Sequence, residues 1–208
     1  MNSPFDKPKV YKDPVEAVIS AYVYEFIQNN RAARIVSDGL RVLGIGLRPV
    51  IDHITFRTLS VDERAQEFLQ LGFEQDVKLG IIEHENWWAK VYRKNGFPAI
   101  FIDQAFEGSR GRESLIPNWV KKFGDKVLHH IAVQVDDIDQ AIYFMEKQGV
   151  PFAGKVVGAR GTDLRQIFTN PEVRDSAAFT VLELAERHHG YSGFLPPQAD
   201  GLMESTRL

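Results

Sequence analysis

The stretch DHITF at residues 52–56 decides the fold, because a related stretch, HHIAV, follows at residues 129–133. A shift of 77 residues places His53 on His130 without a gap, and it also superposes the helical patterns that follow, each of which ends at a glycine. A repeat of this length is a duplicated supersecondary unit and not a solenoid repeat. Two histidines in equivalent positions can meet at the axis between the units, which is one way to build a metal site.

The duplication predicts an α+β fold in which two tandem βαβββ units form a curved mixed sheet around a concave metal site. A capping box at residues 60–63 begins the first helix, and Asp137 with Gln140 begins the second. Three short strands should follow each helix. The predicted strands are 51–58, 74–83, 86–94 and 98–103 in the first unit, and 127–135, 152–158, 164–169 and 178–185 in the second.

The two predicted units divide the chain into five segments. We expect a helical extension at 1–48, the first unit at 49–106, a connecting loop at 107–125, the second unit at 126–190 and a tail at 191–208. The extension should contain a loose lead-in over residues 1–12 and helices at 14–28 and 32–43. Because these helices have no copy before the second unit, they should act as a cap or as a dimerisation element, which makes a homodimer an expectation. The tail should be irregular and close over one end.

Composition limits the function further. The 208 residues are 44% hydrophobic and 25% charged, as in an ordinary globular protein, and they are enough for a sizeable core. A net charge of -3 gives no reason to expect nucleic acid or an anionic membrane as a partner. The polar start of the chain, with no signal-peptide core, makes a cytoplasmic location the expectation. Because there is no cysteine, any metal must be held by nitrogen and oxygen atoms.

Strand alternation gives the two histidines a common direction. Side chains two residues apart share a face of a strand, so one set should pack under the helices and the other should line the concave face. The concave set is His53, Thr55 and Arg57 in the first unit, and His130, Ala132 and Gln134 in the second.

Two imidazoles and one carboxylate form the facial triad that holds Fe(II) and leaves coordination positions open. Glu183 is the best candidate for the third ligand, because a carboxylate among apolar strand residues is costly to bury unless it is paired or metal-bound. Asp103, which ends the matching strand of the first unit, is the competitor by symmetry. The alternative role for Glu183 is an ion pair with Arg160 or Arg165.

The remaining polar residues allow two interpretations each. Arg57 lies about 13 Å beyond His53 on the same face, where it can bind a substrate carboxylate or form an internal salt bridge with Asp103. His129 should face the helices or an edge and be structural. Gln166 should face inward. His84 should lie in a turn, and His188 and His189 should face solvent.

The paired βαβββ units, with a histidine on the first strand of each and a glutamate on the last, resemble the vicinal oxygen chelate superfamily over residues 50–195. The segments QIFT at 166–169 and LELAER at 182–187, with GYSGF at 190–194, are similar to the C-terminal half of 4-hydroxyphenylpyruvate dioxygenases. This resemblance implies that Glu183 binds iron and that Gln166 and Phe194 line the substrate pocket.

The first unit, with DHITFRT at residues 52–58, looks more like the 2-oxoadipate dioxygenase/decarboxylase group. In that group the arginine four residues after the first histidine is thought to hold the distal carboxylate of a dicarboxylic 2-oxo acid, and Arg57 matches it. Both resemblances imply an Fe(II)-dependent dioxygenase that takes a small 2-oxo acid and O2 and couples decarboxylation to hydroxylation. Gln134 would help to orient the substrate.

Two rival functions remain at this point. A glyoxalase-type lyase or isomerase would use Zn, Mn or Ni without oxygen and would favour four protein ligands, with an inward acid near Asp103. A non-catalytic protein of the same fold would bind a small molecule, and His53 and His130 would make ordinary hydrogen bonds.

Overall fold

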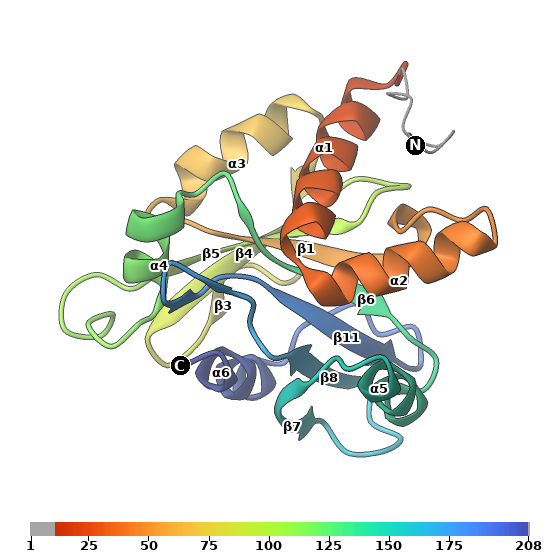
Figure 1. The fold of residues 1–208 in the computed structure, drawn as a ribbon. Coiled ribbons are helices and arrows are strands. Elements are labelled where there is room, and N and C mark those ends of the chain that lie inside the picture. Colours follow the sequence, from red (N-terminus) through yellow and green to blue (C-terminus); the bar gives the residue numbers. More distant parts are fainter. Residues whose placement is uncertain (1–10, 208) are drawn as a thin grey trace.

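The two duplicated units lie side by side in one mixed sheet of the computed structural model, which describes residues 11–207 (Figure 1). Residues 1–10 of the predicted lead-in, and Leu208 of the predicted tail, lie outside the described residues. The strand order is β2-β4-β5-β1-β6-β11-β8-β7, and β3 pairs with β4. The α+β prediction is confirmed. The strands are β1 (Ile51–Arg57), β2 (Glu74–Gln75), β3 (Ile82–Glu83), β4 (Trp87–Arg93), β5 (Ala99–Ala105), β6 (Leu128–Gln134), β7 (Phe152–Val157), β8 (Leu164–Thr169) and β11 (Val181–Arg187). A separate hairpin joins β9 (Val173–Arg174) to β10 (Ala177–Ala178).

The first strands of the two units form the centre of the sheet. β1 and β6 pair antiparallel, as expected for units related by a pseudo-twofold axis. Each then pairs in parallel with the last strand of its own unit, β1 with β5 and β6 with β11. The metal-ligand candidates therefore come from adjacent strands at the middle of the sheet.

Helices cover one face of these central strands. Figure 1 shows α1 (Pro14–Asn29) and α3 (Val61–Gln70) on the same side of β1, with α6 (Pro196–Ser205) on the other side. Between the helices and the sheet lies the larger apolar core, to which each of four central strands contributes alternate residues: Ile54 and Phe56, Ile100 and Ile102, Ile131 and Val133, and Leu182 and Leu184. This alternation leaves the intervening residues of the same strands for the opposite face.

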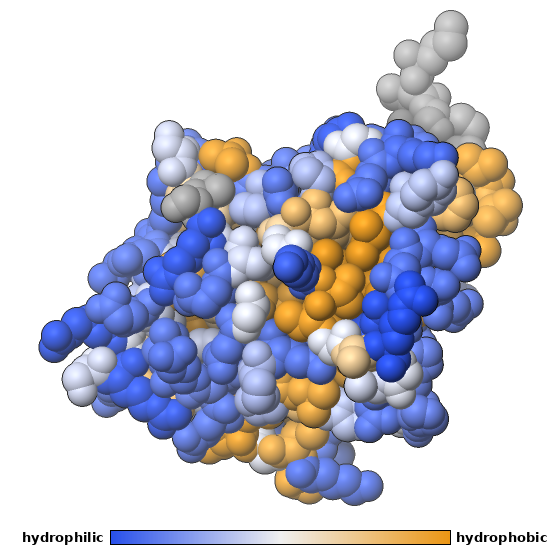
Figure 2. Space-filling view, turned by 90° about the horizontal axis from the view of Figure 1, so that it is seen from below, coloured by the Kyte–Doolittle hydropathy of each residue, from blue (hydrophilic) through white to orange (hydrophobic). Residues whose placement is uncertain are grey.

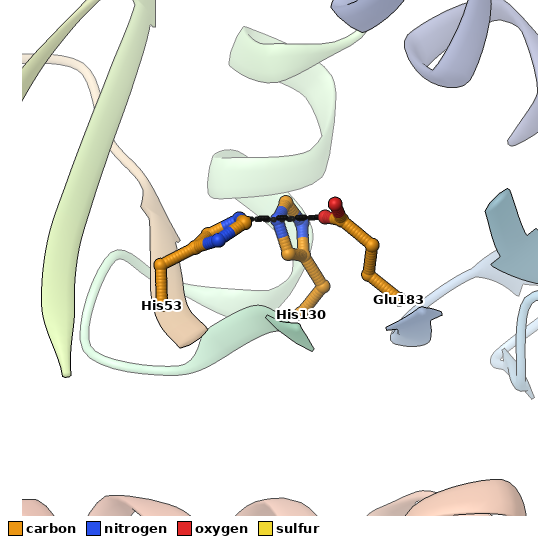
Figure 3. Close-up of side chains that lie close together, drawn as sticks. All are labelled: His53, His130 and Glu183. Atoms are coloured by element: carbon orange, nitrogen blue, oxygen red, sulfur yellow. Dashed lines mark hydrogen bonds and ion pairs between the residues drawn. The ribbon is translucent and has the colours of Figure 1, made fainter. Parts of the chain in front are cut away.

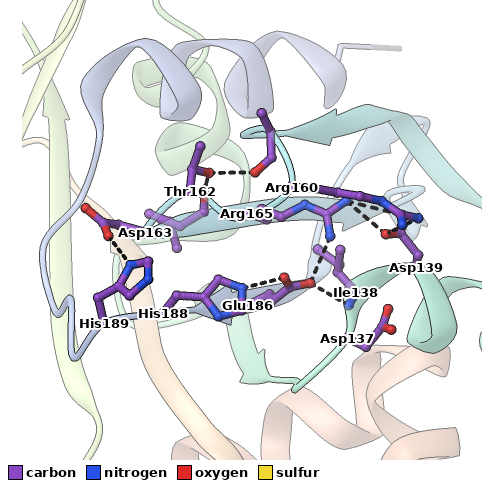
Figure 4. Close-up of polar contacts among 12 residues, drawn as sticks. Asp137, Ile138, Asp139, Arg160, Thr162, Asp163, Arg165, Glu186, His188 and His189 are labelled. Carbon is purple, nitrogen blue, oxygen red and sulfur yellow. Dashed lines mark hydrogen bonds and ion pairs between the residues drawn. The ribbon is translucent and has the colours of Figure 1, made fainter.

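The unit helices begin at side-chain caps that the sequence predicts. Ser60 accepts a hydrogen bond from the backbone of Glu63 at the start of α3, and Asp137 does the same for α5 (Ile138–Lys147). Each unit helix also has a second cap, at an equivalent place in the two units. Gln104 accepts from the first amide of α3, at 2.7 Å, and Glu186 accepts from the first amide of α5, also at 2.7 Å (Figure 4).

Glu186 has two further partners in addition to the helix amide, unlike Gln104, its counterpart in the first unit. Figure 4 shows its carboxylate between the N-terminus of α5, Arg165 and His188, with nitrogen–oxygen distances of 3.0 Å to Arg165 and 2.7 Å to His188. Arg165 also pairs with Asp139, so Glu183 has no ion pair with this arginine. The alternative structural role for Glu183 is therefore not observed with Arg165.

Three segments differ from their predicted structure. The predicted connecting loop contains α4 (Ile116–Phe123), where proline in the first turn and a buried face with Trp119 support a helix that ends at Gly124 with φ 87°. The tail contains α6, which also begins with prolines. The single strand predicted at 74–83 is interrupted, because the Asp76 side chain accepts hydrogen bonds from the backbone of Lys78 and Leu79 and forms a turn.

The helical extension consists of α1 and α2 (Arg31–Val42), close to the predicted boundaries. The end of α2 leaves Val42 and Leu43 exposed. Figure 2 shows, on the face seen from below Figure 1, an apolar area near the centre that polar side chains surround. The homodimer remains a prediction.

No helix within residues 11–207 is long and apolar enough to cross a membrane.

Candidate metal centre

Three buried side chains from three neighbouring strands converge on the concave face. His53 on β1, His130 on β6 and Glu183 on β11 point toward one another (Figure 3). The two Nε2 atoms lie 3.3 Å apart, and Glu183 Oε2 lies 3.3 Å from His53 Nε2 and 3.2 Å from His130 Nε2. The convergence that the duplication and the strand alternation predict is present.

The spacing and chemistry of these atoms fit a divalent metal ion. Three atoms bound to one metal at about 2.1 Å lie about 3.0 Å apart in octahedral geometry and about 3.4 Å apart in tetrahedral geometry. The observed separations of 3.2–3.3 Å fall between these values. Two imidazoles and one carboxylate suit iron, zinc, manganese or nickel, so the donor set does not choose among them.

Hydrogen bonds hold two of the three groups in the orientation that a metal requires. His53 Nδ1 lies 2.7 Å from Asp52 Oδ1, so Nδ1 donates a hydrogen bond to the carboxylate and Nε2 is the atom that a metal would bind. Arg187 in turn fixes Asp52 with two hydrogen bonds of 2.6 and 2.9 Å. Gln166 donates to Glu183 Oε1, which leaves Oε2 for the metal.

The electrostatics of the cluster favour a cation. Burial favours the neutral form of His53, but Glu183 and Asp52 outweigh burial and raise the pKa of His53 to about 9. Burial would raise the pKa of Glu183, yet the two histidines lower it to about 2. Burial lowers the pKa of His130 to about 4. The carboxylates of Glu183 and Asp52 thus stabilise the protonated, positively charged form of His53, and a metal ion would displace the proton from Nε2.

His129 is not where the alternation predicts it. It is buried and lines the same cavity as His130, and its Nδ1 lies 2.9 Å from His130 Nδ1. The cause is an irregularity in the β1–β6 pairing, where Thr55 pairs with His130 but Phe56 pairs with Leu128. Such a bulge inserts one residue and turns successive side chains to the same face. The prediction that His129 faces the helices or an edge is therefore wrong, whereas its structural role stays a prediction.

His129 also sets the tautomer of its neighbour. If His130 offers Nε2 to a metal, its Nδ1 must carry the proton and donate it to His129 Nδ1. The Thr55 hydroxyl lies 2.8 Å from His130 Nε2 and can donate to it, which agrees with an unprotonated Nε2. Burial lowers the pKa of His129 well below its usual range, so the ring is neutral and able to accept.

The symmetry partner of Glu183 is Phe101 and not Asp103. In the first unit His53 pairs with Ala99, and in the second His130 pairs with Val181. Phe101 and Glu183 each lie two residues beyond these partners, whereas Asp103 is not in the metal-ligand cluster. The prediction that Asp103 matches Glu183 is wrong, because it took the end of the predicted strand as the equivalent position, whereas the pairing register of the sheet places Phe101 there. Within residues 11–207 the cluster thus has three candidate ligands, and Phe101 occupies the position equivalent to Glu183 in the first unit.

A small cavity of about 40 Å³ opens beside the cluster, room for about three water molecules. Its polar wall includes Gln166, which faces inward as predicted. Phe194 also lies here, edge-on to His53 with ring centroids 5.1 Å apart. The unpredicted helix α6 contributes apolar residues and narrows the cavity. The lining residues are His53, Arg57, Trp87, Phe101, Asp103, His129, His130, Gln166, Phe168, Glu183, Phe194, Ala199, Leu202 and Met203.

Arg57 and Gln134, which occupy equivalent positions in the two units, have different environments. Arg57 is buried in the cavity, and its Nη2 donates to the sulfur of Met203 at 2.8 Å. Gln134 is exposed and lines a separate polar depression on the other side of Phe194, together with Asp52 and Arg187. The prediction that Gln134 faces the metal cavity is not met, because β6 ends at this residue.

The remaining three histidines of the chain lie away from the metal-ligand cluster. His189 is exposed, as predicted, whereas His188 is half-buried and bound to Glu186. His84 is buried, stacked on Trp87 with ring centroids 3.5 Å apart, and faces Asp200 of α6. None of these three histidines reaches the metal-ligand cluster.

Comparison with known proteins agrees with this architecture. A model of the glyoxalase/bleomycin resistance protein/dioxygenase superfamily matches residues 52–168. No curated protein sequence matches the chain. Among solved structures, a candidate hydrolase from Shewanella frigidimarina NCIMB 400 has a TM-score of 0.73 and 18% identity, and the match covers 90% of this chain and 100% of that one.

Two further structures are named as synthases. The hydroxyglutarate synthase from Oryza sativa, in complex with 2-oxoadipate, has a TM-score of 0.71 and 18% identity, with 97% of each chain covered. A mutant of 4-hydroxymandelate synthase from Streptomyces coelicolor has a TM-score of 0.58 and 19% identity, covering 77% of this chain and 54% of that one. At such identities the likeness shows a shared fold only.

Proposed function

Because this chain belongs to the glyoxalase/bleomycin resistance protein/dioxygenase superfamily, we propose that it is a non-haem Fe(II)-dependent dioxygenase acting on a small 2-oxo acid, with decarboxylation coupled to hydroxylation. His53, His130 and Glu183 would hold the metal. The observation that carries the proposal is the three-ligand set, because Phe101 occupies the position that would provide a fourth ligand.

An open coordination sphere is what this chemistry needs. A bound Fe(II) would supply positions at which O2 and the 2-oxo and carboxylate oxygens of the substrate meet. The protein contributes orientation and exclusion of water. Gln166 and Asp52 fix two of the ligands, while Phe101, Phe168 and Phe194 provide apolar walls around the open side.

Substrate binding must enlarge the cavity. A space for about three waters does not hold a 2-oxo acid of five or six carbons. Leu202 and Met203 of α6 line the cavity, and Met203 contacts Arg57, so α6 or its side chains would move outward when substrate enters. The small 2-oxo acid and O2 are the partners that this proposal requires, and cytoplasmic location is part of it.

The lyase or isomerase remains the second candidate function. The same donor set suits zinc, manganese or nickel and so favours it, but no fourth ligand joins the cluster among residues 11–207, which speaks against it. Asp103 of the first unit lines the cavity, but it lies beside Arg57 and is not part of the metal-ligand cluster.

Metal loading under anaerobic conditions tests the proposal. The protein should bind one Fe(II) per chain and then consume oxygen when a suitable 2-oxo acid is added. Metal binding without oxygen consumption for any 2-oxo acid would favour the lyase. If neither Fe(II) nor Zn, Mn or Ni binds, the non-catalytic binding protein is the better account.

A further inference from the structure

Arg57 and Asp103 form a polar pair at the end of the cavity that lies beyond His53 along β1. They are direct partners across the parallel strands β1 and β5, and both are almost completely buried, with 3% and 2% of their surfaces exposed. Both side chains line the cavity. Nevertheless, no nitrogen of Arg57 lies within 4.0 Å of a carboxylate oxygen of Asp103, so they do not form an ion pair.

Each residue has a buried polar atom without a partner. Among the residues that the structure describes, Arg57 Nε has no acceptor and Asp103 Oδ1 has no donor. A buried donor or acceptor left unpaired costs about 1–3 kcal/mol, and more for charged groups. Two such atoms on neighbouring residues of one cavity indicate that a ligand completes the hydrogen bonding here.

The contacts that Arg57 does make are weak ones. Its Nη2 donates to the Met203 thioether, a poor acceptor, and its guanidinium lies 5.8 Å from the centre of the Trp119 ring. Burial lowers the pKa of Arg57 to about 10, and Asp103 opposes this only in part. Burial likewise raises the pKa of Asp103 to about 7, against the effect of Arg57. Both groups would therefore gain from a ligand that bonds to them.

We propose that Arg57 and Asp103 form a remote subsite that binds a neutral group of the substrate, one that accepts a hydrogen bond from Arg57 and donates one to Asp103. A carboxamide is the simplest such group, since its oxygen suits the guanidinium and its NH2 suits the carboxylate. This inference rests on the proposed function, because the 2-oxo acid end of the same molecule would lie at the metal.

Charge balance argues for a carboxamide over a carboxylate. With Asp103 ionised, as above pH 7, Arg57 and Asp103 together carry no net charge, so a second carboxylate would bring an uncompensated negative charge beside Asp103 in a buried site. A carboxylate would also supply no donor to Asp103 Oδ1. A carboxamide pairs both orphaned atoms and leaves the balance of charge unchanged. The remote subsite thus departs from the dicarboxylic substrate that the resemblance of Arg57 implies.

Three matched ligands test this specificity. The anaerobic Fe(II)-loaded protein is titrated by calorimetry with 2-oxo acids that share the chain from C1 to C6 and differ only in the group at C6: 2-oxoadipate, its 6-carboxamide, and the apolar isostere 6-methyl-2-oxoheptanoate. We expect the carboxamide to bind at least about tenfold more tightly than either of the others. Tighter binding of 2-oxoadipate or of the isostere, or no binding of any of the three, would overturn the remote subsite.

A charge-neutralising variant gives a second test. In Asp103→Asn the C6 carboxylate of 2-oxoadipate no longer lies beside a negative charge. The order of affinities should therefore reverse, with 2-oxoadipate binding more tightly than the carboxamide. The affinity for Fe(II) should stay unchanged, because Asp103 is outside the metal-ligand cluster. Asp62→Asn removes the same charge from the surface and should keep the wild-type order. An unchanged order in Asp103→Asn would overturn the assignment, and the wild-type ranking tests it even if this variant does not fold.

The two proposals fail in different ways. If the carboxamide binds most tightly but no 2-oxo acid supports oxygen consumption, the dioxygenase is wrong and the remote subsite stands. If oxygen is consumed and 2-oxoadipate binds most tightly, the dioxygenase stands and the remote subsite is wrong.

Discussion

Phe101 and Glu183 occupy equivalent positions in the two units, one residue apolar and the other a candidate metal ligand. The duplication supplies matching histidines, but the fourth position is not duplicated. This difference makes the cluster a three-ligand site with an open side bounded by a phenyl ring. It is the feature that separates oxygen chemistry from the four-ligand alternative.

Restoring an acid at the fourth position should close the site. In Phe101→Glu a carboxylate can reach the metal from the first unit, so metal should be retained while oxygen consumption falls at least about tenfold. Phe101→Leu removes the ring without adding a ligand and should keep most of the activity. Metal content and oxygen uptake are measured for both. Full oxygen consumption by Phe101→Glu would contradict the importance of the open position.

Removing the acceptor behind His130 should weaken the metal site. His129→Phe keeps an aromatic ring against Trp119 but cannot accept from His130 Nδ1. Loss of such an outer partner lowers metal affinity by about 10–100-fold. His129→Gln retains an acceptor oxygen and should recover much of the loss. Competition titrations with a metal indicator measure the affinities, and equal values for wild type and His129→Phe would show that the tautomer is fixed by other means.

Shortening the side chain over Arg57 should affect stability and ligand binding in opposite directions. Met203→Ala should lower the free energy of unfolding by about 2–3 kcal/mol, because Met203 is buried. The same change frees Arg57 and enlarges the cavity, so 2-oxo acids should bind more tightly. Met145→Ala, in the core on the helix face, should cost similar stability without changing ligand affinity. If Met203→Ala also leaves ligand affinity unchanged, α6 does not limit access.

Glu186 should matter for stability and not for the metal. Glu186→Gln keeps an acceptor for the first amide of α5, as Gln104 does in α3, and should cost about 1 kcal/mol through the loss of charge beside Arg165. Glu186→Ala leaves Arg165 without this buried partner and should cost about 3 kcal/mol or more. Urea unfolding measures both. Equal costs would mean that the cap contributes little beyond the ion pair.

The sequence predicts the fold and the cluster because both follow from local periodicity. Strand alternation and a gap-free repeat place His53 and His130 on one face, and the apolar surroundings of Glu183 single it out. These are properties of single strands. They do not depend on how distant segments pack.

The features that the sequence does not predict depend on long-range pairing. The side of the strand on which His129 lies follows from a bulge that exists only when β6 pairs with β1. The equivalence of Phe101 and Glu183 follows from sheet register, which a constant shift of 77 residues does not reproduce. Likewise, the sequence predicts α6 only weakly, because the helix is short and buries only Leu202 and Met203, and these two residues become buried only when α6 packs over the cavity.

Oxygen consumption by the Fe(II)-loaded protein, measured together with CO2 release for a panel of 2-oxo acids, tests the central claim most directly. The proposed dioxygenase predicts that at least one 2-oxo acid supports consumption of one O2 per CO2 released, and that Glu183→Ala abolishes both because the metal loses its carboxylate ligand. No oxygen consumption with any 2-oxo acid, or the same rate in Glu183→Ala, would contradict it.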